Sequence, residues 1–321
     1  MEKPVIRISV RNLVEFILRN GDLESGGTAG DKEAMLKGSR LHRKIQKQMG
    51  SHYQAEVSLK KDTEYEDLIL RVEGRADGIF TQNEKICIDE IKGVYKNLEL
   101  LAEPVLVHRA QALCYAWIYL DDHGLEEIDV QMTYAHLDTE MIKRFRETMT
   151  REELESWYQR LLDSYHKWLS YQMKWREERN RSMEKLEFPF IYRKGQKEMV
   201  AGIYHAISRK EQIFIQAPTG VGKTMSAVFP AVRSIGEGKA ETLFYLTART
   251  ITRTVAQDAF EILRKNGLLF KTVTITAKEK LCFCEKPECN PETCPYAKGH
   301  YDRINDAVYE LWTNEQSFDR E

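Results

Sequence analysis

Two acidic positions in the first half of the chain have the order and spacing of a metal-dependent hydrolytic site. Asp77 lies in the extended run LILRVEGRADGIF, and Glu90 lies in the next run, KICIDEIKG, two residues before Lys92. Side chains alternate along a strand, so Glu90 and Lys92 share a face. A carboxylate from each strand can hold Mg²⁺ or Mn²⁺ for phosphodiester hydrolysis, and the Lys92 ammonium can stabilise developing charge. Solvated charges on a meander are the competing interpretation.

Further residues in the required order favour the hydrolytic interpretation. His42, in GSRLH, can supply a third metal ligand, and Gln111 and Tyr115 lie one turn apart on one helix face. The ordered set resembles the RecB-type branch of the PD-(D/E)XK nucleases. That resemblance implies catalytic roles for Asp77, Glu90, Lys92, Gln111 and Tyr115, with Gln111 and Tyr115 lining the site and contacting DNA. Glu56 occupies a position that is often acidic in these proteins and is an additional candidate.

A glycine-rich loop, APTGVGKT at 217–224, predicts phosphate binding. It follows an apolar run and opens a predicted helix, so backbone N–H groups and the helix dipole can both face phosphate oxygens. Lys223 can reach the β- and γ-phosphates, and the Thr224 hydroxyl can bind Mg²⁺. We therefore expect ATP and Mg²⁺ here. The expected contacts in the loop are Thr219, Gly220, Val221, Gly222, Lys223 and Thr224.

The same loop resembles that of superfamily-two helicases, in particular the DinG/XPD-type DNA helicases. The upstream sequence YRKGQ resembles their adenine-reading Gln motif, which implies nucleotide contacts from Arg193 and Gln196. The sequence YLTART after the loop resembles their DNA-backbone-contacting motif. The resemblance implies that the partner is DNA that is single-stranded or carries single-stranded tails.

Four of the six cysteines form a compact cluster that predicts a metal centre. They have the spacing C-x-C-x4-C-x4-C, which suits either zinc or an iron–sulfur cluster. Paired C-x-x-C knuckles, which zinc sites normally have, are absent. The DinG/XPD-type resemblance implies a 4Fe–4S cluster at this place in the chain. The expected ligands are Cys282, Cys284, Cys289 and Cys294, with Cys284 the weakest because it is only two residues from Cys282. The alternative is a fourth ligand beyond Glu321.

Hydropathy periodicity places these motifs in an α/β chain of two domains. Helices are predicted at 8–19, 31–49, 103–121 and about 150–178, and strands at 53–60, 68–80, 85–93 and 127–137. Residues 1–180 are expected to form a PD-(D/E)XK nuclease domain, a mixed sheet flanked by helices and ending in a long helix. Residues 181–321 are expected to form the N-terminal part of RecA-like helicase domain 1. Within it, QIFIQA, the phosphate loop, a helix and TLFYLTAR should form a βαβ unit, followed by an iron–sulfur module at about 278–321.

Composition narrows the class of partner. Charged residues make up 31 % of the 321 residues but nearly cancel, with a formal net charge of −2. DNA binding must therefore use local basic patches. No run of about 18 apolar residues occurs, and no signal peptide is recognisable, so the sequence predicts a cytoplasmic protein without membrane contact.

The helicase resemblance lacks one half of the catalytic machinery. No D-E-x-H or D-E-x-D motif follows Thr224, and no second RecA-like lobe with an arginine finger follows either. We therefore expect the first part of a longer nuclease–helicase fusion, which binds ATP and does not translocate. Two other functions stay open: a DNA-binding scaffold with an inactive nuclease site, and a zinc-binding P-loop ATPase unrelated to DNA.

Overall fold

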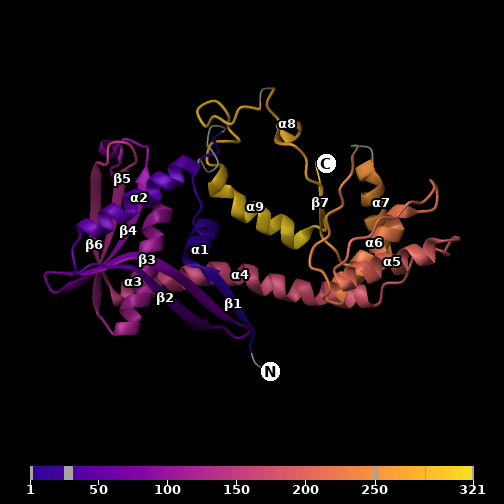
Figure 1. Ribbon diagram of the computed structural model, residues 1–321, viewed down its shortest axis with the longest axis horizontal. Coiled ribbons are helices and arrows are strands. Elements are labelled where there is room, and N and C mark those ends of the chain that lie inside the picture. The colour runs from indigo at the N-terminus through magenta and orange to yellow at the C-terminus, as the bar shows by residue number, and fades with distance from the viewer. Residues whose placement is uncertain (1–2, 25–31, 249–251, 286, 320–321) are drawn as a thin grey trace. The chain divides into compact units, whose positions relative to one another are not determined.

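The computed structural model in Figure 1 describes residues 3–24, 32–248, 252–285 and 287–319. The chain divides into two compact units. The first contains residues 1–168 and 284–308, and the second contains residues 169–283 and 309–321. The 34-residue helix α4 (Arg151–Glu184) contributes residues to both units.

The first unit is built on a six-stranded mixed sheet. Its main path runs β1-β3-β4-β5-β6, and β2 pairs with β3 beside that path. The β1–β3 and β4–β5 pairs are parallel, whereas β2–β3, β3–β4 and β5–β6 are antiparallel. The strands are β1 (Val5–Ser9), β2 (Gln54–Glu64), β3 (Ile69–Gln82), β4 (Lys85–Val94), β5 (Glu127–His136) and β6 (Ile142–Thr150).

This sheet confirms the predicted mixed α/β architecture and corrects two details. The helix predicted at 8–19 is present as α1 (Val10–Ile17), where Ser9 Oγ accepts the Asn12 amide at 3.1 Å and caps the helix, but the sequence did not predict the strand β1 that precedes it. The sequence reading also missed β6, whose alternating exposed and half-buried residues form the edge of the sheet beside β5.

Two helices of the first unit carry predicted site residues to the sheet. Helix α3 (Leu106–His123) has small buried residues at Ala112, Cys114 and Ala116, which allow close packing against strands. Helix α2 (Lys32–Gln48) packs Leu41 and Ile45 against Ile91 of β4 and Ala135 of β5. His42, which follows Leu41, is thereby held beside β4. The short 3₁₀ turn η1 (Leu98–Leu100) precedes α3.

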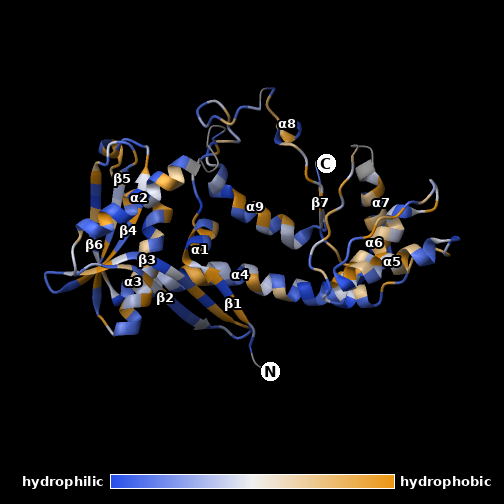
Figure 2. Cartoon of the chain, viewed as in Figure 1, coloured by the Kyte–Doolittle hydropathy of each residue, from blue (hydrophilic) through white to orange (hydrophobic). Residues whose placement is uncertain are grey.

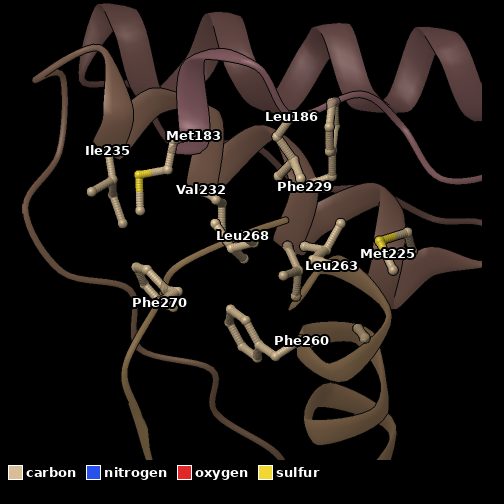
Figure 3. Packing of buried hydrophobic residues seen from close by; sticks show 12 residues of the cluster. Met183, Leu186, Met225, Phe229, Val232, Ile235, Phe260, Leu263, Leu268 and Phe270 are labelled. Atoms are coloured by element: carbon tan, nitrogen blue, oxygen red, sulfur yellow. The ribbon is translucent and has the colours of Figure 1, made fainter. Parts of the chain in front are cut away.

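The second unit has a helical core. Met183 of α4, Val232 of α6 and Leu263 of α7 are fully buried within it, and Phe260 stacks on Phe270 with ring centroids 5.4 Å apart (Figure 3). The remaining elements are α5 (Gln196–Arg209), α6 (Lys223–Gly236), α7 (Thr252–Lys265), β7 (Thr272–Val273), α8 (Lys278–Leu281), α9 (His300–Asn314) and β8 (Ser317–Phe318). Helix α9, like α4, has residues in both units, and β7 and β8 form a two-stranded parallel sheet.

The prediction of two strands around the phosphate loop was wrong. Residues 212–217 and 242–248 have no strand partner among the described residues, so the expected βαβ unit is not formed there. A strand exists only when a neighbour supplies hydrogen bonds. The apolar side chains that suggested buried strands are exposed instead, with Phe214 92 %, Phe244 72 % and Leu246 88 % exposed.

The hydropathy of the helices agrees with which of their residues are buried. Figure 2 draws α4 largely in blue and white, consistent with its many charged residues, whereas α6 carries Val228, Val232 and Ile235 in the core of the second unit. Within the described ranges, no helix is long and apolar enough to cross a membrane.

Candidate functional site

The acidic site of the first unit begins with the pairing of β3 and β4. Gly78 pairs with Asp89 in the antiparallel register, so the next position places Asp77 opposite Glu90. Opposite residues of an antiparallel pair point to the same face of the sheet. Asp77 Oδ2 also accepts the Ile91 amide of β4 at 2.8 Å, which fixes the carboxylate against the neighbouring strand.

Helix α2 brings His42 to this pair of carboxylates. His42 Nδ1 lies 3.7 Å from Asp77 Oδ1, a separation longer than a hydrogen bond. One turn further along α2, Gln46 donates to the Asp77 carbonyl at 2.9 Å and to Glu56 Oε1 at 3.1 Å. Sequence reasoning missed Gln46, although its position four residues after His42 places it on the same helix face. Glu56 also pairs with Arg75, at 2.5 Å from its Nε.

Lys92 links the carboxylates to helix α3. Its Nζ lies 2.8 Å from Glu90 Oε1 and donates to Gln111 Oε1 at 2.6 Å. Glu90, Lys92 and Gln111 therefore form one hydrogen-bonded chain, in which the ammonium is held between a carboxylate and an amide oxygen. This is the arrangement that orients an ammonium toward a reacting group on the site face.

Burial dominates the electrostatics of the two carboxylates. It raises the pKa of Glu90 to about 8, with Lys92 opposing the rise and Asp77 adding to it. Burial also raises the pKa of Asp77, and the strongest opposing influence is His42. Glu90 is 4 % exposed, and its Oε2 is a buried atom with no hydrogen-bond partner in the described structure. A buried carboxylate oxygen without a partner is a strong site for a cation.

Tyr115 reaches the sheet because β3 carries a glycine opposite it. A Cβ built on Gly74 would lie 2.7 Å from the Tyr115 hydroxyl, so only glycine leaves space for the ring. His108, one turn before Gln111 on α3, is a residue that sequence reasoning missed. Its Nδ1 is 3.2 Å from the Tyr134 hydroxyl, and burial lowers the pKa of His108 to about 4, so the ring is neutral at pH 7.

The neighbouring acidic residue Asp89 belongs to the opposite face of the sheet. It accepts hydrogen bonds from Tyr53 at 3.1 Å, Gln131 at 3.1 Å and Thr133 at 2.6 Å. This buried carboxylate is thus fully occupied by neutral donors. Of the neighbouring residues Asp89 and Glu90, only Glu90 can take part in chemistry on the sheet face that carries Asp77.

Metal ligation is not assembled at either predicted centre. Among the residues that the structure describes, no group of three or more His, Cys, Asp or Glu side chains is arranged to hold a metal ion. In the first unit, the Lys92 ammonium lies against one Glu90 oxygen. Within the cysteine segment, Cys284 Sγ lies 3.8 Å from Cys294 Sγ, so the structure brings together the ligand expected to be weakest and the last of the four. The metal sites therefore stay predictions.

The phosphate loop has the backbone geometry of an anion site. Gly220 and Gly222 have φ values of 83° and 75°, in the left-handed region that favours glycine. Helix α6 begins at Lys223 with no side-chain cap, which leaves its N-terminal amides available to a phosphate. Lys223 Nζ donates to the loop's own Ala217 carbonyl at 2.9 Å, and Thr224 Oγ1 lies 3.3 Å from the Tyr245 hydroxyl.

Gln196 is attached to the phosphate loop. Its Oε1 accepts the Arg193 amide at 2.9 Å, and its Nε2 donates to the Val221 carbonyl at 2.8 Å. The Arg193 guanidinium donates to the Gly220 carbonyl, so both residues of the predicted Gln motif hold the loop backbone. The Gln196 amide, predicted to read adenine, thus contacts the loop that surrounds the phosphates. Thr219 lies in the same turn, and Arg249 and Thr250 of the YLTART sequence lie outside the described residues.

Comparison with known proteins supports a functional assignment for one part of the chain, most of which lies in the second unit. Residues 193–288 match the DEAD/DEAH box helicase family, a span that contains the phosphate loop and Gln196. The match supports a helicase-type, ATP-binding function and nucleic-acid binding for this part of the chain. No curated protein matches the sequence. A solved structure described as "Crystal structure of SSO0001" matches 49 % of this chain and 75 % of its own, at 19 % identity and a TM-score of 0.33, a likeness too weak to support any argument.

Proposed function

We propose that the chain couples a metal-dependent DNA nuclease unit to a helicase-type ATP-binding unit that acts in DNA repair or processing. The observation that carries the nuclease assignment is the buried face on which Asp77, Glu90 and Lys92 meet, with Glu90 Oε2 lacking a partner. A divalent cation there would polarise the scissile phosphate and acidify a water. The first unit supplies His42, Asp77 and Glu90 as its ligands.

The protein side chains then divide the remaining work. Lys92, held by Gln111 on α3, places its ammonium where negative charge develops on the phosphate. Gln46 and the Ile91 amide keep Asp77 in place. Tyr115 and Gln111 lie on the same face of α3 and would line the DNA strand. The resemblance to RecB-type nucleases gives the same roles to these residues.

The test is cleavage of labelled single-stranded DNA by the full chain with Mn²⁺. We expect cleavage by the wild type and none by Lys92→Ala, because that substitution removes the ammonium and leaves the core intact. The matched control is Lys85→Ala on the same strand, whose ammonium pairs with Glu127 at 2.7 Å, outside the site. DNA binding without cleavage by the wild type would overturn the nuclease assignment and favour the scaffold.

The second unit is proposed to bind ATP and Mg²⁺ through Lys223, Thr224 and the amides of the loop. The cysteine segment is proposed to hold a 4Fe–4S cluster on Cys282, Cys284, Cys289 and Cys294. Support comes from the close approach of Cys284 to Cys294 and from hydrogen bonding by the Ala297 amide, which lowers the pKa of Cys294 and favours the metal-binding thiolate. Iron and acid-labile sulfide in anaerobically purified protein, lost in Cys294→Ser, would support the cluster. Zinc without iron would replace it with a zinc site.

A further inference from the structure

Strand β5 places a tyrosine beside Lys92 in the first unit. In the parallel β4–β5 register Lys92 is paired with Tyr134, so both side chains point to the sheet face that carries Glu90. The Tyr134 ring is fully buried, and its hydroxyl accepts the Val105 amide at 2.9 Å, where helix α3 begins. The hydroxyl is therefore held at the start of the helix that also carries Gln111.

The Tyr134 hydroxyl determines which nitrogen of His108 carries a proton. His108 Nδ1 lies 3.2 Å from this hydroxyl. The hydroxyl already accepts the Val105 amide, and among the described residues its own hydrogen has no acceptor other than Nδ1. A buried donor without an acceptor is costly, so Tyr134 donates and Nδ1 accepts. The proton of the neutral ring is therefore on Nε2, which remains a hydrogen-bond donor.

His108 lies on the face of α3 that lines the acidic site. Gln111, which holds Lys92, follows it by one turn, and Tyr115 follows Gln111 by another, so the three side chains share one helix face. Three residues advance about 4.5 Å along a helix axis. The His108 ring is half-buried, and none of the described residues is hydrogen-bonded to its Nε2. The donor therefore has no protein acceptor there.

The charged side chains that act on His108 are positive. Lys92 of β4, Arg11 of α1 and Lys96, which follows β4, each lower the pKa of His108, after the larger effect of burial. Such cations disfavour a further proton on the ring and favour an anion beside it. A neutral N–H donor among cations suits a phosphate oxygen, which accepts hydrogen bonds and carries negative charge.

We propose that His108 is a substrate-binding residue, whose Nε2–H donates to a DNA phosphate next to the one that is cleaved. The inference rests on the proposed nuclease function and adds a residue to its substrate contacts. Lys92 acts on the scissile phosphate, and His108 lies one helical turn beyond the Gln111 that holds this lysine. A contact to a non-reacting phosphate binds substrate and transition state equally, so it lowers KM and leaves kcat unchanged.

Two substitutions separate the roles of the two ring nitrogens. The amide oxygen of asparagine takes the place of Nδ1, so His108→Asn keeps the acceptor for Tyr134 and loses the Nε2 donor. The amide nitrogen of glutamine takes the place of Nε2, so His108→Gln keeps the donor and loses the acceptor. A structural role needs the Nδ1 acceptor, whereas phosphate binding needs the Nε2 donor.

Cleavage of labelled single-stranded DNA by the full 321-residue chain with Mn²⁺ gives KM and kcat for each variant. We expect His108→Asn to raise KM by about 10- to 100-fold with little change in kcat, as loss of a hydrogen bond to a charged group does. His108→Gln should restore most of the affinity. The matched control is His123→Asn, at the other end of α3, which should change neither constant.

Three results would overturn the proposal. The first is a wild-type KM in His108→Asn together with a raised KM in His108→Gln, which would give the imidazole a structural role through Tyr134. The second is a lower kcat in His108→Asn at unchanged KM, which would place His108 in the chemical step. The third is an equal rise of KM in both variants while their circular dichroism matches that of the wild type.

Salt dependence tests whether His108 binds phosphate as a neutral donor. The measurement is the fluorescence anisotropy of a fluorescein-labelled thymidine oligonucleotide in EDTA, so that no cleavage occurs. A neutral donor releases no counterion, so His108→Asn should weaken binding by the same factor at every salt concentration. A fall of about 0.7 in the slope of log affinity against log salt, the value for one cation on a single strand, would overturn the assignment.

Failure of this proposal can be told apart from failure of the proposed function. If the wild type cleaves DNA and His108→Asn has the same KM and affinity, only the His108 assignment is wrong. If the wild type binds the oligonucleotide in EDTA without cleaving it in Mn²⁺, and His108→Asn binds more weakly, the nuclease assignment is wrong and the phosphate contact stands. Absence of both binding and cleavage by the wild type would reject both.

Discussion

The acidic face of the first unit and the phosphate loop of the second differ in how completely their surroundings are assembled. Asp77 and Glu90 lie on neighbouring strands of a paired sheet. Asp77 accepts the Ile91 amide of β4, and Glu90 pairs with Lys92 of its own strand, which in turn donates to Gln111 of α3. Among the residues that the structure describes, the extended segments before the phosphate loop and after α6 have no strand partners, and their apolar residues are exposed. The glycines of the loop thus have left-handed φ values although neither extended segment is paired within the described residues.

Substitution at Glu90 should give the largest effect and tests whether the assembled face is catalytic. Glu90→Gln keeps the shape of the side chain and removes its negative charge, so cleavage with Mn²⁺ should fall by about 10²- to 10³-fold or more. Initial rates on labelled single-stranded DNA measure this. Unchanged cleavage would show that Glu90 is not catalytic and that the face carrying Asp77 and Glu90 has a structural role only.

Two stability measurements compare the helical core of the second unit with the exposed segment before the phosphate loop. Leu263 is fully buried, so Leu263→Ala should lower the free energy of unfolding by about 2–5 kcal/mol. Phe214 is 92 % exposed, so Phe214→Ser should change it by less than about 0.5 kcal/mol. Urea unfolding followed by circular dichroism compares them. A large loss for Phe214→Ser would mean that the segment before the phosphate loop is packed in solution.

The pH dependence of stability tests the burial of Glu90. The folded pKa is raised from 4.5 to about 8, so the folded state retains a proton that the unfolded state has lost between these values. Stability should therefore fall as pH rises through this window, by at most about 1.4 kcal/mol for each pH unit. The difference between wild type and Glu90→Gln, measured in EDTA, isolates this carboxyl group. A flat difference would show that Glu90 is charged and paired at neutral pH.

A smaller effect is expected at the phosphate loop. Gln196→Ala removes one hydrogen bond to the loop, to the Val221 carbonyl, and one from the Arg193 amide. Loss of a contact worth about 1 kcal/mol should weaken ATP binding by about fivefold to tenfold. Isothermal titration calorimetry with ATP and Mg²⁺ measures this. Gln216→Ala, in the neighbouring extended segment, serves as the control.

The same loop should bind nucleotide without turning it over. No acidic D-E pair follows Thr224 in the sequence, and the stabilisation of a transferring phosphoryl group depends on such partners. We expect no appreciable ATP hydrolysis by this chain in the presence of DNA. A DNA-stimulated rate that Lys223→Ala abolishes would show that catalytic residues lie elsewhere in the second unit.

Sequence alone was informative where the signal was local. The alternation in KICIDEIKG predicted the strand that carries Glu90 and Lys92. The glycine-rich sequence predicted a phosphate-binding loop, and Gly220 and Gly222 have the left-handed φ values that such a loop can use. Both depend on residues a few positions apart. The long helix predicted at about 150–178 is present as α4, and at its start the Thr150 amide donates to the Glu153 side chain at 2.9 Å.

Non-local partners were what sequence could not supply. Nothing in QIFIQA or TLFYLTAR reveals whether a neighbouring strand is present, so their apolar runs predicted strands that the described structure lacks. The contact of Gln46 with the Asp77 carbonyl and the space that Gly74 leaves for Tyr115 could not be predicted for the same reason, since each depends on a residue of another element. The acidic positions could be ordered by sequence, but the separation of Asp89 from Glu90 onto opposite faces needed the Tyr53 and Thr133 contacts.

The hydrogen bond from the Ile91 amide to Asp77 Oδ2 gives the acidic face a built-in spectroscopic probe. A main-chain proton that points at a carboxylate changes its chemical shift when that carboxylate takes up a proton or a cation. The Ile91 amide resonance therefore records the state of Asp77 in a nuclear magnetic resonance titration. Binding of a proton or a cation at Asp77 can be followed this way without substrate and without a substitution.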